Sequence, residues 1–193
     1  MYKFDRLECA VVILHGNNRA ISEIPAYPEE ISSSVQASWN EQTIIGRTGT
    51  IKAYTGTSDV SSSFSFDLHR EMFIENVYPA TSGSDPYAFE NKVDALVRIL
   101  KTGCYPAYGT NRLDPPRTLF KFGDLYVSGI MTDFQIVWKK PIIEKSYSLC
   151  TVQISMKSAD RRIIDYKDVE RGEYVTTRGH MLTDDPLKGY AND

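Results

Sequence analysis

The segment from residue 115 to 157 alternates apolar and polar residues over two long runs, joined by a charged connection that contains a proline. Successive side chains of a β-strand point to opposite faces, so this alternation predicts a large antiparallel hairpin from Leu125 to Lys157 with one buried face on each strand. In the first run, one predicted face carries Ile130, Thr132, Phe134, Ile136 and Trp138, and the other carries Met131, Asp133, Gln135 and Val137. In the second run, the apolar face carries Cys150, Val152, Ile154 and Met156, and the polar face carries Thr151, Gln153, Ser155 and Lys157.

Shorter apolar runs separated by glycine-containing turns occupy the first half of the chain. The pattern predicts a buried strand at 7–14, a polar connection at 20–30, strand-like runs at 34–46 and 50–54, and a strand at 60–68. The last run is the most regular, with Phe64 and Phe66 on one face and serines on the other. Short strands punctuated by glycine turns indicate a mainly antiparallel sheet.

One helix is predicted between residues 85 and 103. Asp85 can cap its start, and Pro86 suits the first helical position because its missing N–H is not needed there. The following apolar residues share one stripe: Phe89, Val93, Leu96, Val97 and Leu100. Gly103 provides a stop. The predicted fold class is therefore α+β, mainly β: an antiparallel β-sandwich or barrel with one packed amphipathic helix and a long β-hairpin.

Length and charge indicate the domain organisation of the chain. The 193 residues, 41% hydrophobic and 24% charged, fit one folded domain with an extension. We assign residues 1–158 to the domain and 159–193 to a highly charged C-terminal extension, which we expect assembly contacts to order. The apolar run at 9–14 is too short to span a bilayer, so we expect cytoplasmic synthesis without a membrane anchor. The net charge of −3 gives no general attraction to nucleic acid.

Residues that commonly carry chemistry are scattered through the chain. The three cysteines, Cys9, Cys104 and Cys150, lie far apart without metal-binding spacing, and we expect reduced, mostly buried thiols. The histidines, His15, His69 and His180, show no spacing that would place two ligands on one face. We therefore expect no metal, no cofactor, no catalytic residue and no enzymatic activity.

Two enzyme classes, α/β-hydrolases and lysozymes, have only weak signals in the sequence. The strand that runs into His15 and Gly16 invites comparison with the oxyanion loop of α/β-hydrolases, but the chain lacks the G-x-S-x-G pentapeptide that this fold needs. A tail-associated lysozyme would need two carboxylates in a cleft. With 25 acidic residues, some pair is always available, so this signal is not specific.

The order of the motifs carries a resemblance. The run PEEISSSVQASWNEQTIIGRTGTIKAYTGTSDVSSSFSFDL is followed by a helix with a nearby Tyr-Pro-x-Tyr step, by PPRTLFKFGD and by a Trp-Lys-Lys-Pro hairpin. Over about residues 25–158 the chain resembles the tube-like proteins of contractile phage tails and related injection systems. Within that family it is similar to the baseplate hub and tube-initiator group, without the LysM module that some members carry. The matching structural positions are Gly46, Arg47, Pro115, Pro116, Gly123, Trp138 and Pro141.

The resemblance implies a tail-tube fold and a structural role in the virion, at the tail baseplate. Six copies would form a ring whose sheets join into a channel, with the tail tube protein, other hub or tube-initiator rings and baseplate wedge proteins as partners. DNA would pass through without specific binding. The candidate channel lining is then Asp133, Gln135, Thr151, Gln153 and Ser155, and candidate contacts between subunits are Lys139, Lys140, Arg161 and Arg162. The alternative hypothesis is a monomeric β-sandwich module that binds a glycan or a peptide.

Overall fold

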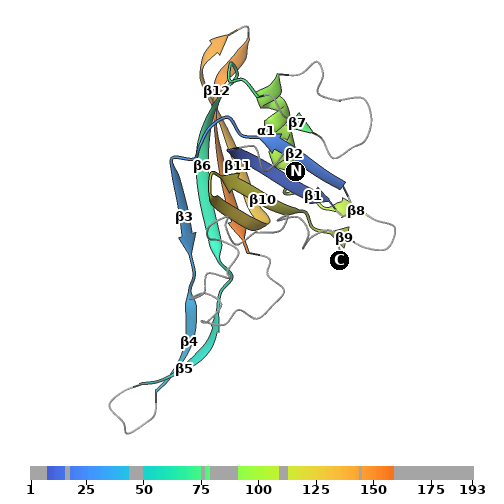
Figure 1. Cartoon of the computed structure of the whole chain (residues 1–193). Helices are drawn as coiled ribbons and strands as arrows, with labels where there is room; N and C mark the ends of the chain where they lie inside the picture. The colour runs from blue at the N-terminus through green and yellow to red at the C-terminus, as the bar shows by residue number, and fades with distance from the viewer. Residues whose placement is uncertain are drawn as a thin grey trace.

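A computed structural model of the chain describes residues 8–15, 18–43, 50–74, 77–78, 91–108, 113–143 and 145–158, which form twelve strands and one helix (Figure 1). The strands are β1 Cys9–His15, β2 Asn18–Glu23, β3 Glu30–Ser34, β4 Ala37–Thr43, β5 Thr50–Thr57, β6 Ser61–His69, β7 Val77–Tyr78, β8 Ala107–Tyr108, β9 Leu113–Asp114, β10 Arg117–Phe122, β11 Leu125–Ile143 and β12 Ser146–Lys157. The helix is α1 Lys92–Thr102. The predicted helix start at 85–90 and the predicted C-terminal extension at 159–193 lie outside the described residues.

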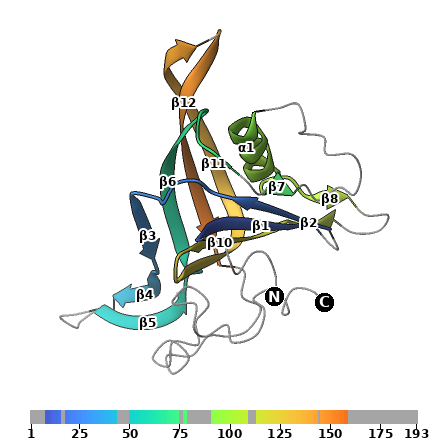
Figure 2. The same cartoon turned by 45° about the horizontal axis from the view of Figure 1, so that its top comes forward.

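Eight of the strands form one antiparallel sheet in the order β3-β6-β12-β11-β10-β1-β2-β7. Strand β11 belongs to both halves of it. Its first residues, 125–129, pair with β10, and residues 130–143 pair with β12. Figure 2 shows the result: β1, β2 and β10 run across the direction of β6, β11 and β12. The long hairpin predicted from the alternation is present, and its first strand also turns the sheet.

Gly129 lies where β11 passes from one half of the sheet to the other. A Cβ atom at this position would be 2.1 Å from the carbonyl oxygen of Lys157 and 2.8 Å from its carbonyl carbon. Both are backbone atoms that cannot move without disturbing β12. Glycine is therefore required at this crossing because the two strands approach too closely for any side chain.

A register shift between Met131 and Asp133 corrects the predicted faces of β11. Thr132 is the extra residue, so the buried face changes from odd to even positions along the strand. Before the shift, Val127 and Met131 are buried; after it, Phe134 packs against the core. The prediction that Ile130 and Thr132 share a face with Phe134 is therefore wrong, because a strict two-residue period cannot reveal a bulge.

The core lies between the two halves of the sheet. The ring of Phe64 in β6 meets Phe120 and Phe122 of β10 edge to face, with centroids 4.8 and 5.2 Å away. Helix α1 closes the core with its buried stripe, which includes Val93, Leu96 and Leu100. The predicted fold class is confirmed: the protein is α+β and mainly β, with one packed amphipathic helix in the described residues and a long hairpin.

The helix begins later than predicted. Asn91 has a non-helical backbone (φ −60°, ψ 134°), and its side-chain oxygen accepts a hydrogen bond from the Val93 N–H at 2.9 Å. Asn91 is therefore the N-cap, and Lys92 is the first helical residue. Its Nδ2 atom also donates to the Arg70 carbonyl at 3.1 Å. A contact from a distant part of the chain thus supports this start, which the local signal at Asp85 and Pro86 could not show.

The predicted polar connection at 20–30 overlaps strand β2 and ends at the first residue of β3. Strand β2 pairs along its whole length with β1, with Ala20 opposite Ile13 and Ser22 opposite Val11. Ala20 and Ser22 are buried. Because these inward side chains are small and one of them is polar, the segment lacked the large apolar residues that mark a buried strand. Its inward face is nevertheless as buried as that of β1.

Strands β4 and β5 form a two-stranded ribbon, here called the arm, which projects away from the body of the sheet (Figure 1). It continues the direction of β3 and β6 beyond Gln36 and Ser58, where Ser58 N–H donates to the Gln36 carbonyl at 2.8 Å. Among the arm side chains that the structure describes, all but Gly56 are exposed. The described residues therefore provide no covering surface for the arm, and an isolated two-stranded ribbon is only marginally stable in water.

Candidate functional site: the polar face of the sheet

The five candidate lining residues lie on one face of the β11–β12 hairpin. Asp133 is directly opposite Ser155, and Gln135 is opposite Gln153. Thr151 is opposite Val137. The bulge at Thr132 lies before all of these pairs, so it does not disturb their common orientation. The structure therefore brings the five predicted residues together in adjacent rows.

The same rows continue across two more strands. Ser155 pairs with Ser63 of β6, which pairs with Ser32 of β3; Gln153 pairs with Ser65, which pairs with Glu30; and Thr151 pairs with Asp67. We define the polar face as these eleven residues: Glu30, Ser32, Ser63, Ser65, Asp67, Asp133, Gln135, Thr151, Gln153, Ser155 and Val137. All are exposed or half-buried, whereas the residues between them on β6 and β12 are buried.

Hydrogen bonds hold the short side chains of this face down on the sheet. The hydroxyls of Ser32 and Ser63 lie 2.7 Å apart. The Thr151 hydroxyl donates to the Asp67 carboxylate. Thr132, beside the face, donates to the Ser155 carbonyl at 3.1 Å. Such cross-strand pairs fix the short polar side chains of this face in place.

The charge on the polar face is sparse and acidic. Its carboxylates are Glu30, Asp67 and Asp133, and none of the eleven residues is basic. Lysines stand only beyond its ends, at Lys139 and Lys157 on the same strands. A surface of this kind repels rather than retains a polyanion, since nucleic-acid binding depends on basic groups that neutralise phosphates.

The remaining predicted positions have separate places in the fold. Gly123 makes the turn between β10 and β11 with φ +61°, a conformation that favours glycine, and its N–H donates to the Glu8 carbonyl at 2.7 Å. Pro115 is exposed and Pro116 is buried just before β10. Trp138 lies opposite Cys150, and Pro141 lies closer to the end of the hairpin.

The candidate subunit contacts fall into two groups. Lys139 and Lys140 are exposed near the end of β11. Arg161 and Arg162, the other two candidate contacts, lie outside the described residues, as do the family-like structural positions Gly46 and Arg47. Only the lysine pair can therefore be placed on a surface.

The thiols are poorly suited to nucleophilic chemistry. Burial raises the pKa of Cys150 to about 11 and also raises the pKa of Cys9, so both thiols stay protonated at neutral pH. Cys9 and Cys150 are buried, as expected of mostly buried thiols, and Cys104 is the exposed exception. The pKa of Cys104 is also raised, first by partial desolvation and then by Asp133. All three are free cysteines.

The described residues offer neither a metal-binding cluster nor a membrane-spanning helix. They contain no cluster of three or more His, Cys, Asp or Glu side chains that could hold a metal ion. In the same part of the chain, the single helix is too short and too polar to cross a bilayer.

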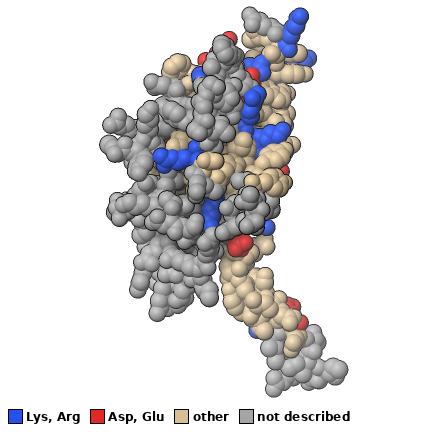
Figure 3. Space-filling view, turned by 90° about the vertical axis from the view of Figure 1, so that its right-hand side faces the viewer, with Lys and Arg blue, Asp and Glu red and all other residues tan. Residues whose placement is uncertain are grey.

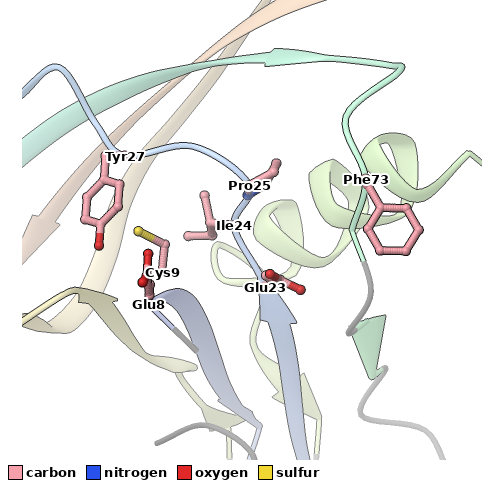
Figure 4. Close-up of a pocket in the computed structure, with 7 residues that line it drawn as sticks. All are labelled: Glu8, Cys9, Glu23, Ile24, Pro25, Tyr27 and Phe73. Atoms are coloured by element: carbon pink, nitrogen blue, oxygen red, sulfur yellow. The ribbon is translucent and has the colours of Figure 1, made fainter. Parts of the chain in front are cut away.

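A shallow groove at the start of β1 was not predicted from the sequence (Figure 4). Its volume is about 300 Å³. We call it the acidic groove; its lining residues are Glu8, Cys9, Glu23, Ile24, Pro25, Tyr27 and Phe73. They come from three separate segments of the chain, so no local sequence motif could have predicted the groove.

Carboxylates dominate the electrostatics of the acidic groove. Tyr27 and Cys9 point toward one another in Figure 4. Burial raises the Cys9 pKa, and the carboxylates of Glu8 and Glu23 raise it further. The Tyr27 pKa is raised chiefly by Cys9, with Glu8 and Asp124 adding to the effect. Negative charge therefore surrounds this groove.

No protein-family model matches the chain, and no curated protein matches it either.

Proposed function

We propose that the protein is a structural component of a contractile phage tail: six copies form a ring of the baseplate hub or tube initiator, which connects the tail tube to the baseplate. The observation that carries this proposal is the polar face, which extends in register over four strands and ends at the edge strand β3. A channel wall needs such a surface, and the motif order described above supports the same assignment.

The sheet edge explains why copies would join. Strand β3 is the first strand of the eight-stranded sheet, and its side chains from Ser32 to Ser34 are exposed. Unpaired edge strands offer backbone donors and acceptors to another chain. In a closed ring each edge strand pairs with a neighbouring copy, so the edge that is exposed in one copy forms the interface of the assembly.

The composition of the polar face fits the passage of DNA. Several of its short side chains are hydrogen-bonded to one another, and its charges are carboxylates. A lumen with this character would not hold the phosphate backbone, because it offers no cations to replace the condensed counterions. DNA would pass through without specific binding.

The exposed arm is a second observation that supports an assembled state. Both of its faces are exposed, including Trp39 at 56% and Tyr54 at 55%. Aromatic side chains are enriched at protein interfaces. The tail tube protein, an adjacent hub or tube-initiator ring, or a baseplate wedge protein would supply the missing cover, in the virion at the tail baseplate.

The same aromatic pair favours a second candidate function, a monomeric β-sandwich module that binds a glycan or a peptide. The rings of Trp39 and Tyr54 lie 5.3 Å apart at an interplanar angle of 69°. One exposed ring face could stack on a sugar, although the edge-to-face arrangement offers no flat double platform.

Native mass spectrometry and negative-stain imaging of the purified full chain distinguish the two candidates. The proposed function predicts sixfold rings, alone or with tube, hub or baseplate components. A Ser33→Lys, Ser34→Lys variant places charges on the β3 edge and should block the rings. The matched variant Gln135→Lys, Gln153→Lys, on the central strands β11 and β12, adds the same number of charges and should still form them. A strictly monomeric protein that binds a glycan through Trp39 would contradict the ring and support the module.

A further inference from the structure

The end of the β11–β12 hairpin is an apolar surface with a basic border. Ile142, Ile143 and Tyr147 are exposed there. Lys139 and Lys140 precede them, and Lys145 follows at the turn; all three lysines are exposed. We call this surface, residues 139–143 and 145–147, the hairpin tip. Figure 3 shows basic side chains at this end of the molecule, opposite the arm.

The hairpin tip projects beyond the body of its own chain (Figures 1 and 2). Within the part of the chain that the structure describes, the ion pairs join Lys52 to Glu41, His69 to Glu71 and Arg70 to Asp94. None involves a tip lysine. The tip thus presents uncovered apolar side chains and cations together, which is a combination typical of an interaction surface.

The acidic groove presents the complementary combination. Its aromatic walls are exposed, Tyr27 at 53% and Phe73 at 83%, and its floor is the buried Ile24. Carboxylates of Glu8 and Glu23 stand at its border (Figure 4). Its volume of about 300 Å³ is at the lower end of the range for ligand pockets, which suits one or two inserted side chains.

We propose that the hairpin tip of one copy docks in the acidic groove of the next copy. The proposal rests on the proposed ring and names one of its contacts. Isoleucine and tyrosine side chains of the tip would fill the groove between Tyr27 and Phe73. The tip lysines would face Glu8, Glu23 and Asp124, and an ammonium group can also lie over the face of Tyr27 or Phe73.

Charge complementarity selects a second copy as the occupant. Residues 139–145 contain three lysines and one glutamate, whereas the groove border contains carboxylates and no basic lining residue. An anionic lipid surface would also attract the tip, but it would leave the aromatic groove empty and bordered by like charge. A contact between two different surfaces of identical chains is head-to-tail, and such contacts close into rings when the rotation allows it.

Paired charge reversals in the full chain test the contact. The tip variant is Lys139→Glu, Lys140→Glu, and the groove variant is Glu8→Lys, Glu23→Lys. Each alone opposes like charges, so the protein concentration for half-assembly should rise at least about tenfold. A mixture of the two variants should assemble again, because every tip then meets a groove of opposite charge in an alternating ring. Native mass spectrometry would show three copies of each.

Matched controls separate charge from folding. Lys92→Glu, Lys101→Glu reverses the same number of exposed charges on α1 and should leave assembly unchanged. Because Glu23 already has an interaction in the fold, Phe73→Ser serves as a second groove variant; its side chain is mostly exposed, so loss of assembly with an unchanged melting curve supports the contact.

Three outcomes would overturn the proposal. If rings form normally in every variant, the contact is wrong while the ring itself stands. If the natural chain forms no ring, the proposed function fails together with the contact. If the reversals change thermal stability in dilute monomers instead of assembly, a segment of the same chain occupies the groove, and the second-copy assignment is wrong.

Discussion

The guanidinium of Arg70 donates to both carboxylate oxygens of Asp94, at 3.0 and 2.8 Å, and so joins the turn after β6 to the first turn of α1. The same guanidinium lies 5.2 Å from the centre of the Trp138 ring in β11. Arg70 therefore links three elements of the core: the strand that precedes it, the helix and the long hairpin.

Replacement of Arg70 tests this link. Both partners are about a quarter exposed, so solvent weakens the pair, and Arg70→Ala should lower the free energy of unfolding by about 1–2 kcal/mol. Arg70→Lys keeps the charge but loses the planar contact with Trp138, so it should recover only part of the loss. Urea unfolding measures both. A double-mutant cycle with Asp94→Asn should give a coupling energy; a coupling near zero would show that the two side chains act independently.

Gly129→Ala should be the most damaging small substitution in the chain's sheet. The added methyl group meets the Lys157 backbone at 2.1 Å, so β11 and β12 must separate, at a cost of about 3 kcal/mol or more. The control is Gly103→Ala. There the added atom meets the movable end of the Met131 side chain at 2.9 Å, and a change within about 1 kcal/mol is expected. Equal effects in urea unfolding would contradict the close crossing of the strands.

Stability should fall at alkaline pH through Cys150. Its pKa is about 11 in the folded protein and 9.0 as the reference value for the unfolded chain. Below pH 9 both states hold the proton. Between pH 9 and 11 the unfolded state releases it and the folded state does not, so unfolding becomes easier by at most about 1.4 kcal/mol per pH unit.

Urea unfolding between pH 8 and 10.5 checks the cysteine prediction. Cys150→Ala should flatten the alkaline decline relative to the natural chain. Cys104→Ala, which removes an exposed thiol, should change the slope less. If the two variants show the same decline as the natural chain, lysine and tyrosine side chains rather than Cys150 cause it.

Lysines placed on the polar face should make the ring hold DNA. Gln135 and Gln153 are directly opposite one another, and Gln135→Lys, Gln153→Lys adds two positive charges per copy to the channel wall. Preassembled rings of this variant should bind a linear duplex at least about tenfold more tightly than natural rings at low salt, with a steep salt dependence. A closed circular DNA cannot thread a preassembled ring, so it should gain nothing.

The matched control places the same pair of charges outside the channel. Asn40 and Ala53 are also directly opposite one another, on the exposed arm. Asn40→Lys, Ala53→Lys should increase the affinity for linear and circular DNA alike. If the polar-face variant also binds both forms equally, its lysines are on an outer surface, and the channel assignment fails.

The hairpin and the helix stripe were predictable from the sequence because their signals are local. Alternation along Leu125–Lys157 and the spacing of Val93, Leu96 and Leu100 each arise from the geometry of one element. The bulge at Thr132 was not predictable, since a threonine suits either face of a strand. The helix start was not predictable either, because Asn91 is held by Arg70, which is 21 residues away in the chain.

The candidate site was predictable only within the hairpin. Asp133, Gln135, Thr151, Gln153 and Ser155 share a face by alternation alone. Their continuation into Ser63 and Ser32 depends on the pairing of β6 with both β12 and β3, which no periodicity specifies. The acidic groove joins three distant segments and therefore needed the fold.

A cryo-EM reconstruction of the assembled protein, alone or with its tail components, tests the central claim most directly. The account predicts a sixfold ring in which Asp133, Gln135, Thr151, Gln153 and Ser155 point toward the axis and β3 meets a neighbouring copy. A ring in which those side chains point away from the axis would contradict the channel assignment, and a protein that stays monomeric under all these conditions would contradict the proposed function itself.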